Sequence, residues 1–70
     1  MTCGETLKLV RKWKRLSQRK LADKIKTSQQ YISELEKCRH FNGNKLEKLL
    51  KAMNITKTEW ETFRKLPPPH

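Results

Sequence analysis

The stretch SQRKLADKIKTSQQYISELEK, residues 17–37, decides the fold of this chain. Its apolar residues recur at spacings of three and four, which is the period of a helix. Ser17 and Ser28 each precede such an apolar run, where a serine hydroxyl can accept from the unpaired N–H groups of a helix start. The stretch therefore predicts two short helices, one from Ser17 to about Lys26 and one from Ser28 to Lys37.

The link between these two helices is only a few residues around Lys26 and Thr27. Two short helices joined so tightly must cross steeply, as they do in the helix-turn-helix motif. In that motif the second helix lies in the major groove of duplex DNA, and its N-terminal residues meet the base edges. The pattern therefore predicts an all-α protein that binds duplex DNA with residues 28–37.

Three further helices are expected outside this stretch, and no part of the chain shows the alternation of a strand. One covers about residues 5–15. The next follows a polar run with a glycine, Cys38 to Asn44, which is expected to be a loop, and it ends near Asn54. Asparagine tolerates the left-handed conformation that closes many helices. The last begins at the capping-box spacing of residues 56–59.

A chain of 70 residues permits one domain. We expect a compact bundle of five short helices over residues 1–66, followed by a proline-rich tail at residues 67–70, since proline cannot continue a helix. A domain of this size has a modest core and little room for an enclosed substrate pocket. The sequence shows no nucleophile–base pairing, glycine-rich phosphate loop or carboxylate pair, so an enzyme is not expected.

The chain is strongly basic. It has 17 lysines and arginines against 7 aspartates and glutamates, which gives a net charge of +10 and a pI of about 10.1. Self-repulsion of this size costs stability unless the partner is a polyanion, so the charge favours a nucleic-acid partner over a merely basic protein. Between Thr6 and Ala22 there are basic residues and no acidic one, so one end of the domain is expected to be positive.

The N-terminal residues of the second helix are suited to reading bases. Gln29 and Gln30 follow the cap and are expected to point outward. A glutamine amide offers a donor and an acceptor together, which matches N6 and N7 of adenine, and a glutamate can accept from N4 of cytosine. The expected base contacts are Gln29, Gln30, Ser33 and Glu34; the alternative is that they are ordinary polar residues of a solvated helix.

Phosphate contacts are expected from polar and basic residues around the two helices. Gln18 directly follows Ser17, where its side chain and the helix start can both face a phosphate. Such contacts add affinity without sequence information. The expected set is Gln18, Arg19, Lys20, Ser28, Arg39, His40, Asn42, Asn44 and Lys45.

Arg11 and Glu36 are expected to form a structural ion pair. Arg11 follows Val10 and Glu36 follows Leu35, so each charge lies beside an apolar position. An arginine–carboxylate pair can join through two parallel hydrogen bonds, which suits such a place.

Residues 17–25 and 27–36 together resemble the phage repressor and Cro family of helix-turn-helix proteins, the XRE-like regulators. The likeness extends from Leu7 to Trp60, and its most specific part is the Ser-Gln-x-x-Leu-Ala opening followed by Ile-Ser-x-x-Glu. The resemblance implies the lambda repressor-like fold of five short helices, which usually binds operator DNA as a dimer.

The resemblance also implies roles for particular side chains. Gln18 is expected to meet phosphate, and Arg11 to pair with Glu36. The residues implied at the bases are Gln29, Gln30 and Glu34.

The chain departs from the family pattern at three places. Lys26 stands where the family usually has the glycine of the turn, so it is expected to adopt a strained backbone conformation unless the turn differs. Cys38 stands where a glycine often follows the second helix, and residues 41–43 replace a common proline and leucine.

The family includes phage repressors and Cro proteins, antitoxins that repress their own operon, and controller proteins of restriction systems. The sequence does not separate them, but a free-standing Cro-like or controller-like repressor is favoured because no second domain is evident. A protein-interaction adaptor of the same fold would need an exposed apolar patch. Trp13 is the candidate residue for such a patch, although a position at the edge of the core is favoured for it. A cationic membrane-binding helix would need neither the capping signals nor the glutamines.

A homodimer is expected because one module this small contacts only a half-site. The apolar residues left for the interface are Ile55, Phe63 and Leu66, with Trp60 in the core. Two cysteines with His40 and His70 lack the spacing of a zinc site, so no metal, cofactor or small-molecule substrate is expected. Free thiols, no membrane span and no signal peptide favour the bacterial cytoplasm or a phage-infected host cell.

Overall fold

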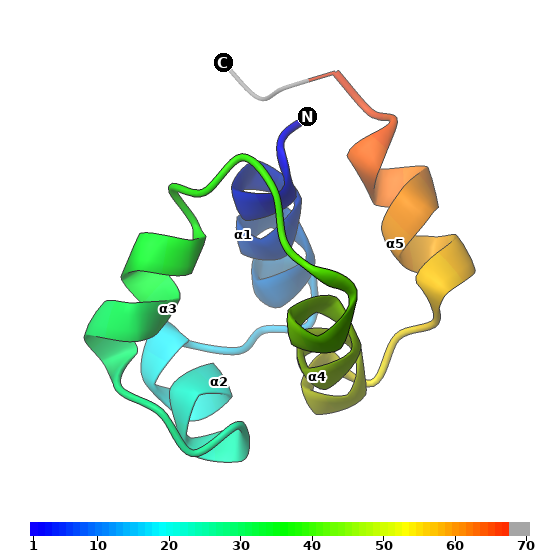
Figure 1. Cartoon of the computed structure of the whole chain (residues 1–70). Coiled ribbons are helices and arrows are strands. Elements are labelled where there is room, and N and C mark those ends of the chain that lie inside the picture. The colour runs from blue at the N-terminus through cyan, green and yellow to red at the C-terminus, as the bar shows by residue number, and fades with distance from the viewer. Residues whose placement is uncertain (68–70) are drawn as a thin grey trace.

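Five helices joined by short links make up the part of the chain that the computed structural model describes, residues 1–67 (Figure 1). The helices are α1 (Cys3–Trp13), α2 (Gln18–Lys24), α3 (Gln29–Leu35), α4 (Gly43–Met53) and α5 (Lys57–Arg64). No strand occurs in these residues. The expected all-α bundle of five helices is therefore confirmed; residues 68–70 of the expected tail lie outside the described part.

Side chains cap the start of every helix. The N-caps, each of which accepts from a backbone N–H one turn ahead, are Thr2, Ser17, Ser28, Asn42 and Thr56. At the start of α1, Glu5 reaches back to the N–H of Thr2, and the bonds from Thr2 hold the pKa of Glu5 below its usual value. Each cap satisfies an N–H group that has no partner within its helix, and so fixes where the helix begins.

The two helices of the helix-turn-helix are shorter than the apolar spacing suggested. The expected helix 28–37 is only Gln29–Leu35, because Ser28 is its N-cap and Glu36 its C-cap. In the same way α2 ends at Lys24, whereas α1 keeps its expected length but begins and ends two residues earlier, at Cys3 and Trp13. The expected loop from Cys38 to Asn44 ends at Asn42, since the side chain of Asn42 accepts from the N–H of Lys45 and starts α4 there.

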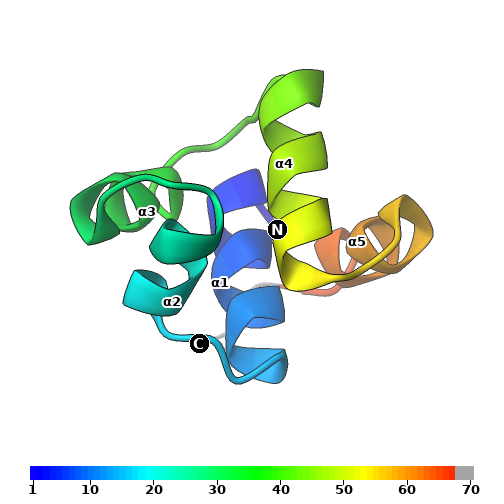
Figure 2. The ribbon, with the colours of Figure 1, turned by 90° about the horizontal axis from the view of Figure 1, so that it is seen from below.

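The core draws on every helix, with α1 at the centre, α2 and α3 on one side and α4 and α5 on the other (Figure 2). Helix α3 packs against α2, α2 against α4, and α1 against α5. Phe41, in the link before α4, is also buried, with its ring centroid 6.3 Å from that of Trp60. The buried apolar residues are Leu7, Val10, Leu21, Ala22, Ile32, Leu35, Phe41, Leu49, Leu50, Met53, Ile55 and Trp60.

The start of α1 is bonded to the backbone that follows α3. The N–H of Cys3 donates to the carbonyl of Arg39 at 3.1 Å, and the N–H of Gly4 donates to that of Cys38 at 2.9 Å. A methyl group at Gly4 would lie 2.6 Å from the Cys38 oxygen and closer still to that of Glu36. Only glycine lets α1 approach this closely, so Gly4 helps fix the end of α3.

Within residues 1–67, three residues other than glycine have a left-handed backbone: Arg15, Lys26 and Asn54, with φ of 58°, 56° and 57°. The expectation for Asn54 as the residue that closes α4 is confirmed, and so is the strained conformation of Lys26 in the turn. The conformation of Arg15 was not foreseen. Cys38 does not have a positive φ, so its place after α3 does not require the family's glycine.

Replacing Lys26 by glycine is expected to raise the free energy of unfolding by about 1 kcal/mol. A left-handed φ costs a residue with a Cβ about 1–2 kcal/mol, and the greater freedom of unfolded glycine offsets part of the gain. Urea unfolding of the variant and the parent measures the difference. The control is Lys20→Gly within α2, which should lower the free energy of unfolding by about 1 kcal/mol. If Lys26→Gly also lowers the free energy of unfolding, the backbone of Lys26 is not strained in the turn.

None of these helices is long and apolar enough to cross a membrane.

Candidate nucleic-acid interface

Helix α3 presents a polar face, and its apolar residues hold it in place. Ile32 and Leu35 are 0% and 2% exposed, and they attach α3 to the core. Gln29, Gln30 and Glu34 are exposed, and Ser33 is half-buried. The side chains expected at the bases therefore lie on the side of α3 that the core leaves free.

The starts of α2 and α3 are linked through their glutamines. The Nε2 of Gln29 donates to Oε1 of Gln18 across 3.5 Å, and the Nε2 of Gln18 donates to Oε1 of Glu36 at 2.9 Å. The first of these bonds is at the long limit and contributes little by itself. The second holds the Gln18 amide, so the side chain that meets Gln29 has a defined orientation.

Arg11 and Glu36 form a buried ion pair beneath this site. The Nε of Arg11 donates to Oε2 of Glu36 at 2.6 Å, and the two side chains are only 10% and 6% exposed. The expected double hydrogen bond between them does not form; Gln18 donates to the second carboxylate oxygen, and Nη1 of Arg11 donates to the carbonyl of Leu16 at 2.7 Å. The pair thus joins α1, the link before α2, and the end of α3.

The residues expected at phosphates lie at the starts of α2, α3 and α4 and in the link before α4. Gln18 and Lys45 are half-buried, and the others are exposed. The side-chain oxygens of Ser28 and Asn42 already accept from the helix starts that they cap. In Figure 1 the link leaves the C-terminal end of α3, whereas Gln18 lies alongside α3, with hydrogen bonds to Gln29 at its start and to Glu36 at its end.

The residues expected at a dimer interface differ in exposure. Ile55 is 8% exposed and belongs to the core, so its assignment to the interface is wrong; it directly follows the left-handed turn at Asn54, which directs the chain back to the core. Phe63 is half-buried, and Leu66 is 44% exposed.

Trp13 is not the edge-of-core residue that its spacing suggested, because 52% of it is exposed. It stands at the last turn of α1 and packs against Phe63, with the ring centroids 5.2 Å apart. The Nζ of Lys14 lies 4.8 Å from the centroid of the Trp13 ring. Trp13 and Phe63, together with the exposed Leu66 three residues after Phe63, are called the aromatic face.

Sequence reasoning missed the part that α4 plays beside α3. Tyr31 and Thr27 share a hollow of about 270 Å³ with Lys45 and Lys48 of α4. No sequence signal joins these residues, because only packing brings the two helices together. In residues 1–67 no group of three or more histidines, cysteines or acidic residues is placed to hold a metal ion, and Cys3 and Cys38 are free thiols.

The fold and the polar face of α3 define a helix-turn-helix domain. Residues 7–60 match the family model described as helix-turn-helix, which is well over half of the chain. The chain belongs to this family, the Cro/C1-type, XRE-like helix-turn-helix proteins, and is a DNA-binding transcriptional regulator of that type. The comparisons with curated proteins and with solved structures found no match.

Proposed function

We propose that the protein is a sequence-specific repressor that reads the major groove with α3, as a dimer on a palindromic operator. The observation that carries this proposal is the exposure of Gln29 and Gln30 at the start of a helix whose opposite side is fixed in the core. A free glutamine amide can form two hydrogen bonds to one adenine in the major groove. Ser33 and Glu34, one turn further along, complete the proposed reading face.

The phosphate contacts are proposed for the residues at the starts of α2, α3 and α4 and in the link before α4. They would set the register of the protein on the duplex and supply most of the salt-dependent affinity. The proposed contacts are Gln18, Arg19, Lys20, Ser28, Arg39, His40, Asn42, Asn44 and Lys45. A domain bound in this way represses by occupying the promoter, as a Cro-like or controller-like regulator does. Its place would be the bacterial cytoplasm or a phage-infected host cell.

The proposed dimer uses the aromatic face. Compared with the interface expected from the sequence, it includes Trp13 and leaves out Ile55, which is buried. Trp13 and Leu66 are exposed large apolar residues, and Phe63 lies against Trp13. Sedimentation of Leu66→Ser should show a weaker dimer than the parent. A parent chain that stays monomeric at all concentrations would refute the dimer and favour the second candidate: an antitoxin or an adaptor that offers Trp13 to another protein.

The experiment that tests DNA binding is a salt titration on duplex DNA. With six or more phosphate contacts, the observed association constant should fall about a thousandfold or more between about 50 and 200 mM salt, because each contact releases counterions. Fluorescence anisotropy of a labelled duplex measures this. A plot of log affinity against log salt that stays flat would refute the proposal.

Replacing Gln29 or Gln30 by alanine is expected to weaken binding to the preferred operator by about 1–3 kcal/mol. Binding to random duplex should change much less, because the lost hydrogen bonds are to bases. The matched control is Asn44→Ala, which removes an exposed amide from the proposed phosphate contacts and should affect operator and random duplex alike. Equal losses on both duplexes for Gln29 and Gln30 would make them backbone contacts instead.

A further inference from the structure

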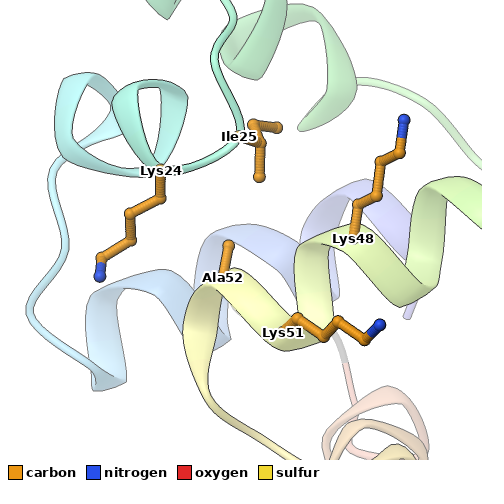
Figure 3. Close-up of a pocket in the computed structure, with 5 residues that line it drawn as sticks. All are labelled: Lys24, Ile25, Lys48, Lys51 and Ala52. Atoms are coloured by element: carbon orange, nitrogen blue, oxygen red, sulfur yellow. The ribbon is translucent and has the colours of Figure 1, made fainter.

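A second basic surface lies between the end of α2 and the outer side of α4. Lys24, Lys48 and Lys51 surround a shallow hollow of about 460 Å³ whose floor is Ile25 and Ala52 (Figure 3). None of its lining residues is acidic, and neither of the ion pairs formed within residues 1–67 involves these lysines. Three like charges without a partner repel one another, so the fold alone does not account for their being together.

This hollow adjoins the smaller one beside α3. The two share Ile25 and Lys48, and the smaller one is also lined by Thr27, Tyr31 and Lys45. Thr27 directly precedes Ser28, the cap of α3. These two adjoining hollows are together called the groove; its lining extends from Thr27, beside the start of the proposed reading helix, to Lys51 in the later turns of α4.

The lysines of α4 that line the groove succeed one another along the helix. Lys45, Lys48 and Lys51 follow one another at every third residue of α4, which places successive Cα atoms about 4.5 Å further along the helix axis. Phosphates of one DNA strand are about 3.4 Å apart along the duplex axis, a spacing of the same order. In Figure 3 the side chains of Lys24, Lys48 and Lys51 extend in different directions, so they do not converge on one small anion.

We infer that this groove binds the phosphate backbone of duplex DNA beyond the base pairs that α3 reads, through Lys24, Lys48 and Lys51. The inference rests on the proposed function, because the same duplex must first engage α3. The protein would then cover a longer stretch of DNA than its five short helices suggest. Sequence-independent contacts of this kind add affinity and salt dependence but no base preference.

The test compares the triple variant Lys24→Gln, Lys48→Gln, Lys51→Gln with the parent on two random-sequence duplexes. One duplex has about one helical turn, roughly 10 base pairs, and the other about three turns. On the longer duplex the slope of log affinity against log salt should decrease in magnitude by about 2–3, since each lysine–phosphate contact contributes close to one unit. On the short duplex it should change little.

The control variant Lys12→Gln, Lys57→Gln, Lys65→Gln removes the same charge from exposed sites on α1 and around α5. If the slope of log affinity against log salt falls equally for both variants on the longer duplex, only net charge matters, and the inference that the groove binds DNA is overturned. An equal loss on both duplexes also overturns it, because the lysines would then lie within the footprint of α3. If the parent binds neither duplex, the proposed function fails and the groove with it.

A direct measurement on the parent protein avoids any effect of substitution on folding. Acetylation of lysine amines, followed by mass spectrometry, should show that the three-turn duplex protects Lys24, Lys48 and Lys51, whereas the one-turn duplex leaves them reactive. If the longer duplex protects Lys45 but leaves Lys24, Lys48 and Lys51 as reactive as before, the inference is overturned. DNA binding by α3 would then still stand.

Discussion

Replacing Arg11 by methionine is expected to lower the free energy of unfolding by about 3–5 kcal/mol, as removal of one member of a buried ion pair usually does. The Glu36 carboxylate is 6% exposed and would keep only the hydrogen bond from Gln18. The carbonyl of Leu16 would also lose its donor from Arg11. Thermal or urea unfolding measures the loss.

The control for Arg11 is the exposed pair of Arg64 and Glu61, 3.0 Å apart with side chains 46% and 35% exposed. Arg64→Met should cost less than about 1 kcal/mol, because solvent screens a surface pair. A double-mutant cycle with Glu36→Met separates pairing from packing. The double variant should be clearly more stable than the sum of the single losses predicts, and additive losses would show that the two side chains are not coupled.

Gly4→Ala is expected to cost about 2–3 kcal/mol, in the range found when a packed site is overfilled. The added methyl group would meet two carbonyl oxygens of the backbone after α3, which cannot move aside as a side chain can. Either α1 shifts and its hydrogen bonds to Cys38 and Arg39 lengthen, or the end of α3 moves. DNA affinity should therefore fall along with stability.

Gly43→Ala is the matched control, because it is also a glycine in the first turn of a helix and has nothing within 4 Å of an added Cβ. The higher helix propensity of alanine should leave this variant unchanged or stabilise it by up to about 1 kcal/mol. If the two alanine variants unfold alike, the close approach at Gly4 does not constrain the fold.

Features that depend on local sequence were predictable. The caps Ser17 and Ser28 and the apolar spacing after them indicated α2 and α3, because both act within one or two turns of a helix. The left-handed conformation of Asn54 followed from its residue type and place, and that of Lys26 followed from the glycine that the family usually has in the turn; the structure confirms both. The membership in the helix-turn-helix family followed from the same stretch.

Features that depend on contacts between distant residues were not predictable. Gly4 is close to the backbone after α3, and Phe41 packs on Trp60, although neither pair has a sequence signal. Trp13 shares the helical spacing of the core residues of α1, yet α5 covers only one side of it. The start of α1 is different, because the capping box of Thr2 and Glu5 is visible in the sequence and was overlooked.

The most direct test of α3 as the reading helix is selection of bound sequences from random duplex DNA by the full chain. We expect one enriched motif, present as two inverted half-sites whose centres are about one helical turn apart, roughly 10 base pairs. The same selection with the variant Gln29→Ala, Gln30→Ala should lose the motif while total DNA recovery remains. Recovery of unenriched sequences by the parent chain would contradict sequence-specific reading by α3.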